Sequence, residues 1–450
     1  MDDFEEKTKA FRQWLLANSV EISDSVDFHD YRHLNQGRGL IAVKDIESDE
    51  LLFKIPLTAV AAVEYDKDFS KSIDTEELGP WLSLIAYLMS LQNSAKWKPY
   101  FDVLPQSFNT PMFWSSFEAL KGSALVDKIG IEQAEEQYNI SLKPVLELEQ
   151  FANTDVSLNA FHRMGSIIMA YSFDIESEDG EPIKAMVPLA DTLNAHTSLC
   201  NAHLCHPENG YLEMRSIKPI SQGSQIYNTY GELPNSDFLR RYGYVEAGGT
   251  DFDVVEITSS LIAKAVASEY KLPVSDIESS LERLANYEEE ADAYDESYGI
   301  YDESYDIPFS GEPDQANLGL LLYLQLSAHT QYDIKQTIRQ IGNLIGNDEI
   351  TEEAKTIWEK AIELRLAEYP TLLVARANEE EVKITDETIT DPMAMAHEIV
   401  FGEIRILNRS LQWVRGMSTV PSGPILEKLN KKRKSENNGV SSSSVKHQRT

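Results

Sequence analysis

The sequence predicts an α+β protein in which a β-rich core is interrupted by helices and followed by a helical domain. β-prone apolar runs occur before residue 60 and return between residues 184 and 230. Between them, from about residue 75 to 170, apolar residues recur three and four positions apart, which is the spacing of amphipathic helices. The same spacing dominates after residue 250. This order predicts a first domain over residues 1–250 and a helical domain over residues 251–424.

The first half begins with a helical pattern and two strand patterns. Phe4, Phe11, Trp14 and Leu15 fall on related faces of a short amphipathic helix. The runs LIAV and ELLFKIP flank the polar turn KDIESD, an arrangement that predicts a β-hairpin. The helical insertion then reads PWLSLIAYLMSLQ, PMFWSSFEALKG, AEEQYNISLKPVLELEQFA and LNAFHRMGSIIMAYSFD.

Strand patterns return in KAMVPLAD, NAHLCHPENGYLEMRSIKP and SQIYNTYG. The sequence Pro-Glu-Asn-Gly at 207–210 predicts a turn inside the second of these runs. These strands are expected to complete the β-rich core.

Two segments of the second half carry unusual charge. Residues 276–306 contain twelve Asp or Glu and one basic residue, Arg283, which predicts an acidic, mobile insertion over about residues 276–310. It is either a solvated loop or a surface for a basic partner. Residues 425–450 predict a disordered, basic and Ser-rich tail. Its KKRK cluster at 431–434 is either a nuclear import signal or part of a solvating tail.

The composition predicts an intracellular protein whose acidic charge either attracts a basic partner or only keeps the protein soluble. A net charge of −34 repels nucleic-acid phosphates and attracts basic proteins or peptides. No apolar run approaches the roughly 18 residues of a membrane span, and the acidic start MDDFEEKTKAF lacks the features of a signal peptide. Two cysteines cannot supply a disulfide framework. We therefore expect a reducing compartment, no direct nucleic-acid binding and no membrane insertion.

The common signatures of metal, nucleotide and hydrolase sites do not account for this chain. Cys200, His203, Cys205 and His206 have the side chains of zinc ligands, but their spacing is tighter than in familiar zinc sites. On a strand, His203 and Cys205 face one side and His206 the other, so we expect no metal. The phosphate-binding glycine loops, the G-x-S-x-G elbow and the H-E-x-x-H helix are all absent from the sequence.

Three dispersed segments remain: NQGRGL at 35–40, DTLNAHTSLCN at 191–201 and QIYNTYGELPNSDFLRRYGY at 225–244. Gly37 and Gly39 suit either a turn or a backbone that approaches a ligand closely. Asn194 can either bind a ligand through its amide or cap a helix. The tyrosines of the third segment either pack a core or line a channel.

Together and in this order, these segments resemble the SET-domain protein-lysine methyltransferases of the Rubisco large-subunit methyltransferase type. The branch of fungal ribosomal-protein lysine methyltransferases is the most similar. The resemblance also rests on DELLFKIP, on W-K-P-Y-F with L-P at 97–105, on AYSFD at 170–174 and on VPLADTLN at 187–194. It implies a β-rich SET core with a knot-like threading of the segments around Asn194 and Tyr230, a helical insertion and an all-α C-terminal domain.

The resemblance also implies a cofactor, S-adenosyl-L-methionine, and a set of site residues. Tyr230 matches the catalytic tyrosine of the family. Many relatives have Asn-His where this chain has Asn194 and Ala195, which puts the affinity for the cofactor in question. The residues expected to contact the cofactor are Gly37, Arg38, Gly39, Tyr171, Asn194, Ala195 and Tyr242. The residues expected near the substrate are Trp97, Ser172 and Asp174.

Methyl transfer to lysine explains why tyrosines would cluster. An in-line displacement needs an aligned, neutral amine and a site without water, and phenol rings supply apolar walls with polar ends. The predicted function is methylation of lysine in a basic protein, a ribosomal protein first and a histone or nuclear regulator second. The alternative is a non-catalytic SET-like module that binds a peptide. We expect a monomer located in the nucleus, with a cytoplasmic fraction.

Overall fold

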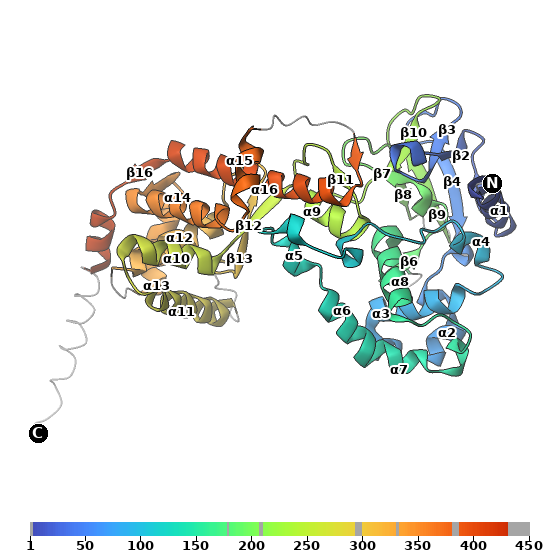
Figure 1. Cartoon of the computed structure of the whole chain (residues 1–450), viewed down its shortest axis with the longest axis horizontal. Helices are drawn as coiled ribbons and strands as arrows, with labels where there is room; N and C mark the ends of the chain where they lie inside the picture. Colours follow the sequence, from blue (N-terminus) through green and yellow to red (C-terminus); the bar gives the residue numbers. More distant parts are fainter. Residues whose placement is uncertain are drawn as a thin grey trace, which may run out of the picture. The chain divides into compact units, whose positions relative to one another are not determined.

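The computed structural model describes residues 3–177, 180–206, 210–292, 299–329, 333–379 and 387–430. These residues form two compact units, drawn in Figure 1 with colours that follow the sequence. The first unit takes its residues from 1–117, 127–250 and 385–395, and the second from 118–126, 251–384 and 396–450.

Helices and strands alternate in the predicted order along the chain. The α-helices are α1 (Phe4–Ala17), α2 (Lys67–Ser72), α3 (Thr75–Leu91), α4 (Lys98–Phe101), α5 (Leu125–Lys128), α6 (Ile131–Gln137), α7 (Lys143–Leu146), α8 (Leu158–Tyr171), α9 (Asn235–Asp237), α10 (Ser259–Tyr270), α11 (Val274–Asp292), α12 (Gln315–Ser327), α13 (Ile334–Ile345), α14 (Glu352–Leu366), α15 (Thr371–Glu379) and α16 (Pro392–Gly416). Two shorter helical turns used below are η4 (Pro111–Phe113) and η9 (Phe238–Tyr242). The strands are β1 (Glu21–Ile22), β2 (Val26–Asp30), β3 (Arg38–Ala42), β4 (Leu51–Pro56), β5 (Ser172–Glu176), β6 (Pro182–Met186), β7 (Asn194–Ala195), β8 (Ala202–Cys205), β9 (Tyr211–Ser216), β10 (Gln225–Asn228), β11 (Val245–Glu246), β12 (Val254–Thr258), β13 (Ser304–Pro308), β14 (Glu349–Thr351), β15 (Thr388–Ile389) and β16 (Ser418–Val420).

Two four-stranded sheets form the β core of the first unit, with strand orders β1-β4-β9-β8 and β2-β3-β10-β7. The predicted strands at LIAV and ELLFKIP are present as β3 and β4, but the predicted hairpin between them is wrong. β3 pairs with β2 and β10, whereas β4 pairs with β1 and β9. Alternating apolar residues select a strand and its buried face, but they do not select its partner. β3 and β4 therefore belong to two different sheets.

The other predicted strands join these sheets. NAHLCH and GYLEMRS become β8 and β9, which pair antiparallel, while the turn predicted between them falls mainly on residues 207–209, outside the described residues. β10 pairs antiparallel with β3 and parallel with β7, where Tyr227 lies opposite Asn194. β10, which belongs to the third segment that the sequence singled out, therefore pairs with residues of the other two.

The helical insertion of the first unit is built around α3 and α8, which pack against each other. Ser157 caps the start of α8 by accepting a hydrogen bond from the backbone N–H of Ala160 at 3.2 Å, and Asp74 caps α3 in the same way through Glu77 at 3.1 Å. α8 buries Phe161, Met164, Ile167 and Ile168 in the same apolar core as the two sheets. α8 ends at Tyr171, and β5 begins at the next residue.

The second unit has its own apolar core, which includes the fully buried Trp358. Its helices are accompanied by two pairs of short strands, β12 with β13 and β14 with β16, which the all-α prediction did not include. The segment 118–126, which the sequence places within the helical insertion, packs in this unit. Ser123 there donates a hydrogen bond to Glu403 at 2.6 Å.

The mobile acidic insertion predicted over residues 276–310 is largely replaced by regular structure. α11 covers Val274–Asp292 and buries Ile277 and Leu284, whose spacing places them on one helix face. β13 then pairs along its whole length with β12. On this helix Asp276, Glu282, Glu289 and Glu290 are exposed, whereas Glu288 is buried. The first DESY repeat, at 295–298, lies outside the described residues.

The structure confirms the α+β class and the predicted alternation of β-rich and helical segments. Within the described residues, no helix has both the length and the apolar character needed to cross a membrane. The KKRK cluster at 431–434 falls outside the part of the chain that the structure describes.

Candidate active site

Three cavities formed by described residues of the first unit share the side chains of Tyr171 and Tyr230. The first, second and third cavities have volumes of about 480, 360 and 250 Å³. Because both tyrosines line all three, the cavities adjoin one another at these two rings. Among the further lining residues are Asp174, Asp191 and Arg241 in the first cavity, Gly37, Arg38 and Asn194 in the second, and Asn109, Ala195 and Tyr242 in the third.

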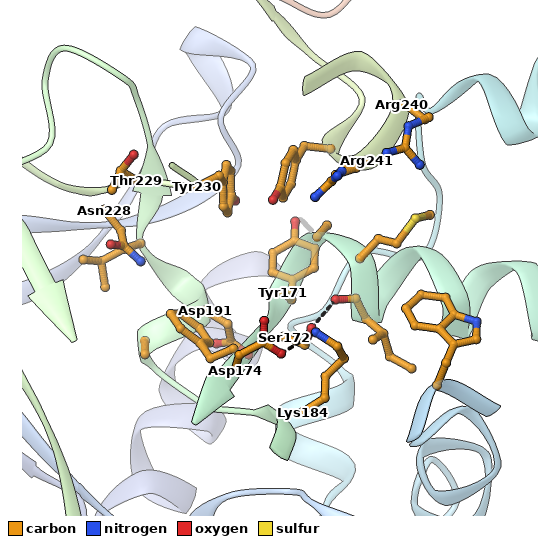
Figure 2. Close-up of a pocket in the computed structure, with 18 residues that line it drawn as sticks. Tyr171, Ser172, Asp174, Lys184, Asp191, Asn228, Thr229, Tyr230, Arg240 and Arg241 are labelled. Atoms are coloured by element: carbon orange, nitrogen blue, oxygen red, sulfur yellow. Dashed lines mark hydrogen bonds and ion pairs between the residues drawn. The ribbon is translucent and has the colours of Figure 1, made fainter. Parts of the chain in front are cut away.

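The tyrosines of the 225–244 segment gather at this junction. Tyr230 follows β10, Tyr242 ends η9, and their rings stack with centroids 3.8 Å apart and planes inclined by 12°. Tyr244 also lines the third cavity, and its ring stacks on Phe238 at 5.3 Å. Of the two interpretations that the sequence left open, the structure therefore places Tyr230, Tyr242 and Tyr244 at cavity walls. Figure 2 shows Tyr230 and Tyr171 on the border of the first cavity.

Burial raises the pKa of these phenols further above neutral pH. It raises the pKa of Tyr171 to about 12 and the pKa of Tyr230 well above its usual value, because the low-dielectric surroundings disfavour the phenolate. Burial also raises the pKa of Tyr242 and Tyr244. The junction is thus lined by neutral rings whose hydroxyl groups can donate or accept hydrogen bonds.

Asn194 offers an unused hydrogen-bond donor. It lies on β7 between the second and third cavities, and its side-chain nitrogen Nδ2 is buried without a hydrogen-bond partner among the described residues. A buried donor without a partner costs about 1–3 kcal/mol, which a ligand acceptor would recover. Gly39 makes room for this amide, since a Cβ at Gly39 would lie 2.7 Å from Nδ2 and 2.8 Å from the Tyr31 ring.

The GRG segment presents its backbone to the second cavity and its arginine side chain to α1. Gly37 adopts a positive φ of 69°, a conformation that L side chains rarely take. The Arg38 guanidinium donates to Thr8 Oγ1 at 2.9 Å and to the Val103 carbonyl at 3.2 Å, and it stacks over the Phe4 ring. Its hydrogen-bonding capacity is therefore largely taken up by the protein, and the predicted cofactor contact is left to the backbone and the aliphatic part of Arg38.

The AYSFD segment runs from the end of α8 into β5 along the first cavity. The Ser172 hydroxyl donates to the Ile168 carbonyl at 2.6 Å, while Asp174 accepts from Lys184 at 2.6 Å. Both residues line the first cavity, as predicted for residues near a substrate. The Asp174 side chain is 73% exposed, which places it at the solvent side of the cavity. Their substrate contacts stay a prediction.

Trp97 does not lie where the resemblance suggested. It is buried in the core of the first unit, with its ring 5.3 Å from Trp14 and 6.0 Å from Tyr100, and it lines none of the cavities described here. Its indole therefore anchors α1 against α4, and the predicted contact with a substrate does not fit this position. In the motif W-K-P-Y-F the aromatic residues form core rather than binding surface.

Asp191 is a site residue that the sequence analysis missed. It lines both the first and the second cavity, and its carboxylate accepts a hydrogen bond of 2.5 Å from the Tyr100 hydroxyl. Burial raises its pKa to about 7, against the opposing effect of that hydrogen bond. The signal was present in KAMVPLAD, where one acidic residue ends an apolar run, but its burial depends on Tyr100, 91 positions away.

Hydrogen bonds from two other segments fix the backbone that follows Asn194. The His196 backbone N–H donates to the Asn228 carbonyl at 3.2 Å, and Thr197 donates to Glu246 through its backbone at 2.9 Å. Ala195 itself lines the third cavity, whereas His196 is buried with its Nδ1 3.7 Å from Glu246. The segment after Asn194 is therefore hydrogen-bonded to both ends of residues 225–246, at Asn228 and at Glu246.

The cysteine and histidine cluster lies mainly on β8. Within the part of the chain that the structure describes, no group of three or more potential metal ligands comes together. Cys200 and Cys205 are both free thiols there.

Comparison with known proteins places this architecture in a family. Residues 37–231 match the family model described as the SET domain. Ribosomal lysine N-methyltransferase 4 of Saccharomyces cerevisiae is 31% identical over 416 residues, which covers 82% of this chain and 84% of the relative. The chain belongs to the SET-domain family of protein-lysine methyltransferases. The resemblance that the sequence indicated is confirmed.

Further relatives and solved structures agree with this family. Ribosomal lysine N-methyltransferase 4 of Schizosaccharomyces pombe is 25% identical, over 63% of this chain and 76% of the relative. N-lysine methyltransferase setd6 of Xenopus laevis is 32% identical over 52% of this chain and 56% of the relative. A crystal structure of the SET domain of LSMT bound to lysine and AdoHcy superposes with a TM-score of 0.66 at 17% identity, covering 95% of this chain and 94% of that one. The predicted SET fold with its helical C-terminal region is thereby confirmed.

Proposed function

We propose that this SET-domain protein transfers a methyl group from S-adenosyl-L-methionine to the side-chain amine of lysine in a protein substrate. The observation that carries the proposal is the junction of three cavities at Tyr171 and Tyr230. Beside the second cavity lies Asn194 Nδ2, which has no hydrogen-bond partner in the described part of the chain. A transfer reaction needs two reactants to enter from different cavities and to meet at one place. The junction at the Tyr171 and Tyr230 rings provides that place.

The second and third cavities suit the cofactor. The free Nδ2 of Asn194 is a donor for a carboxylate or carbonyl group, and the backbone of Gly37 and Arg38 borders the second cavity. Ala195 and Tyr242 border the third. When bound, the cofactor supplies an electrophilic methyl group carried on a sulfonium. The protein positions it through these contacts and keeps the junction free of water with aromatic rings.

The first cavity suits the lysine. Neutral phenols at Tyr171 and Tyr230 orient the amine by hydrogen bonds while their rings give apolar walls. An apolar surrounding and a neighbouring positive charge both lower the pKa of the amine from its reference value of about 10.4. Asp191 has a pKa of about 7, so at neutral pH a large fraction is ionised and can attract the ammonium group and accept a proton from it. Tyr230 is proposed as the residue that positions the amine.

The substrate is proposed to be a basic protein, with ribosomal proteins first. The yeast relative that aligns over 82% of this chain is named a ribosomal lysine N-methyltransferase, and ribosomal proteins are typically basic. The net charge of −34 favours approach of a basic partner through long-range attraction. It also disfavours direct contact with nucleic acid. Histones and nuclear regulators are the second class of candidate.

The test is transfer of labelled methyl from S-adenosylmethionine into an extract of cells that lack this protein. We expect a labelled protein band with the wild type and a loss of about 100-fold or more with Tyr230→Phe, because one oriented hydroxyl at the reacting centre is removed. Tyr211→Phe is the matched control, since Tyr211 lies on β9 and lines none of these cavities. Equal labelling by Tyr230→Phe and the control would refute the role of Tyr230.

Calorimetry with S-adenosylmethionine separates the enzyme from the non-catalytic alternative that Ala195 kept open. Micromolar binding together with labelling supports the enzyme. The absence of both binding and labelling supports a peptide-binding module.

We also propose a monomer, tested by light scattering. A nuclear location with a cytoplasmic fraction rests on KKRK at 431–434. Removal of residues 425–450 from a fluorescent fusion should reduce the nuclear signal, and an unchanged distribution would contradict this.

A further inference from the structure

A fourth cavity, of about 150 Å³, adjoins the first cavity. The two cavities share three lining residues, Trp81 from α3, Met169 from α8 and Arg240 from η9. The fourth cavity shares no lining residue with the second or the third. A chain that places a lysine in the first cavity can therefore place another side chain in the fourth.

The walls of the fourth cavity are mostly apolar. Besides Trp81 and Met169 they include Met112 of η4, Ala134 of α6 and Phe161 of α8. Helices that are distant in sequence thus meet around one small space, and all of the lining residues belong to the first unit. An apolar occupant would gain contact with these side chains and lose contact with water.

The polar groups on the walls do not favour a charged occupant. Arg240 donates to Asp237 at 2.8 Å, so its charge already has a partner. Burial lowers the pKa of His162, which therefore stays neutral at neutral pH. Ser166 adds a neutral hydroxyl group. A carboxylate or ammonium group placed here would lose its hydration without a free counter-charge in return.

The volume of the fourth cavity limits the size of the apolar side chain that it can hold. An apolar cavity of about 150 Å³ is large enough to hold a molecule the size of benzene. A leucine, isoleucine, methionine or phenylalanine side chain fits this volume, whereas alanine leaves most of it empty. Since an extended chain advances about 3.3 Å per residue, a side chain next to the first cavity lies within roughly three residues of the lysine.

We propose that the fourth cavity is a specificity subsite that takes a large apolar side chain located within three residues of the lysine to be methylated. This inference rests on the proposed lysine methylation and adds a sequence requirement to it. The substrate segment then combines a lysine, bound at the tyrosine junction, with an apolar neighbour bound between α3, α6 and α8.

Two variants change the size of the subsite without touching the junction. Ala134→Met fills the cavity from α6, and Met112→Ala enlarges it from η4. Glu136→Leu is the matched control, because Glu136 is exposed on the same helix as Ala134 and lines none of the four cavities. Cofactor affinity measured by calorimetry and thermal unfolding verify that each variant is folded.

The experiment first locates a labelled lysine in extract proteins by mass spectrometry. Peptides spanning it, or the substrate protein itself if peptides are inactive, are then made with Ala, Leu, Phe or Asp at each of the three positions on either side. We expect one position where Leu raises kcat/KM about tenfold or more over Ala and Asp. Ala134→Met should abolish that preference, Met112→Ala should shift it towards Phe, and Glu136→Leu should keep it.

The outcomes separate this inference from the proposed function. Labelling without an apolar preference at any position overturns the subsite, as does a preference that Ala134→Met leaves equal to that of Glu136→Leu. Both results leave lysine methylation intact. Absence of labelling together with absence of cofactor binding refutes the proposed function itself, and the subsite falls with it.

Discussion

The two units each bury a carboxyl group whose pKa is raised to about 7, and the two groups differ in what surrounds them. Asp191 in the first unit accepts a hydrogen bond from the Tyr100 hydroxyl, is also hydrogen-bonded by Thr192 and by the backbone at Leu189, and lines two cavities. Glu403 in the second unit accepts from Ser123 at 2.6 Å and from Tyr369 at 2.7 Å, and it lines none of the cavities described here. In both cases burial is the main cause of the shift.

The comparison teaches that a perturbed pKa alone does not identify a functional carboxyl group. Both groups are destabilised as anions by the loss of water, which is a property of any buried acid. Both oxygens of Glu403 are engaged by hydroxyl groups, so its bonding is satisfied inside the protein. Asp191 is also hydrogen-bonded inside the protein, but in addition it borders two cavities. Access to a ligand, rather than the shift, distinguishes the two.

The largest expected effect tests this distinction directly. Asp191→Asn should lower kcat/KM for methyl transfer by about 100-fold, because the variant loses the group that attracts the amine and accepts its proton. Glu403→Gln should change kcat/KM less than threefold. Both rates are measured with the labelled-methyl assay at saturating cofactor. Similar losses in the two variants would erase the functional difference between the two carboxyl groups.

The pH dependence of activity sharpens the same comparison. Asp191 is mainly protonated below its pKa of about 7 and ionised above it, so kcat/KM should rise roughly tenfold from pH 6 to pH 8 through this group. The rise should disappear in Asp191→Asn and persist in Glu403→Gln. An unchanged profile in Asp191→Asn assigns the ionisation to another group, such as the substrate lysine.

Cofactor binding should depend on Asn194 and not on either acid. Asn194→Ala removes the free Nδ2 donor, and we expect Kd for S-adenosylmethionine to rise about tenfold, corresponding to about 1.4 kcal/mol. Calorimetry of the wild type, Asn194→Ala and Glu403→Gln measures the difference. Equal affinities in all three would remove Asn194 from the cofactor site.

Glu403 should act on stability, with a sign set by its raised pKa. Between pH 4.5 and 7 the folded state holds a proton on Glu403 that the unfolded state releases, so stability falls as pH rises through this window. The contribution is at most about 3 kcal/mol. Glu403→Gln mimics the protonated form, so its stability relative to the wild type should increase from pH 5 to pH 8. Denaturant unfolding at both pH values measures this; a constant difference would contradict it.

The smallest effect on activity is expected at Trp97. Trp97→Phe should leave kcat/KM within about twofold, because the indole packs against Trp14 and Tyr100 and lines none of the described cavities. It should lower the free energy of unfolding by about 1–2 kcal/mol through lost packing. A selective rise in KM for the protein substrate would restore Trp97 to the substrate site.

Prediction from the sequence succeeded where local pattern and motif order carry the information. The strands β3, β4, β8, β9 and β10 and the helices α3 and α8 follow from periodicity, because a buried face imposes a repeat of two or about 3.6 residues. It failed where partners are chosen at long range. The predicted β3 and β4 hairpin separated into two sheets, and the acidic segment became α11 because Ile277 and Leu284 found a core to join.

The sequence by itself determined the α+β class, the family and most of the residues that border the junction, since motifs and their order are properties of the chain. Only the tertiary structure decided which of those side chains are free to bind. There the guanidinium of Arg38 donates to Thr8 and Val103, and Trp97 is buried. Asn194 Nδ2 has no hydrogen-bond partner among the described residues, and Asp191 lies beside Tyr100. The reason is physical: burial, hydrogen-bond satisfaction and pKa depend on neighbours brought together from distant positions, and no local pattern records them.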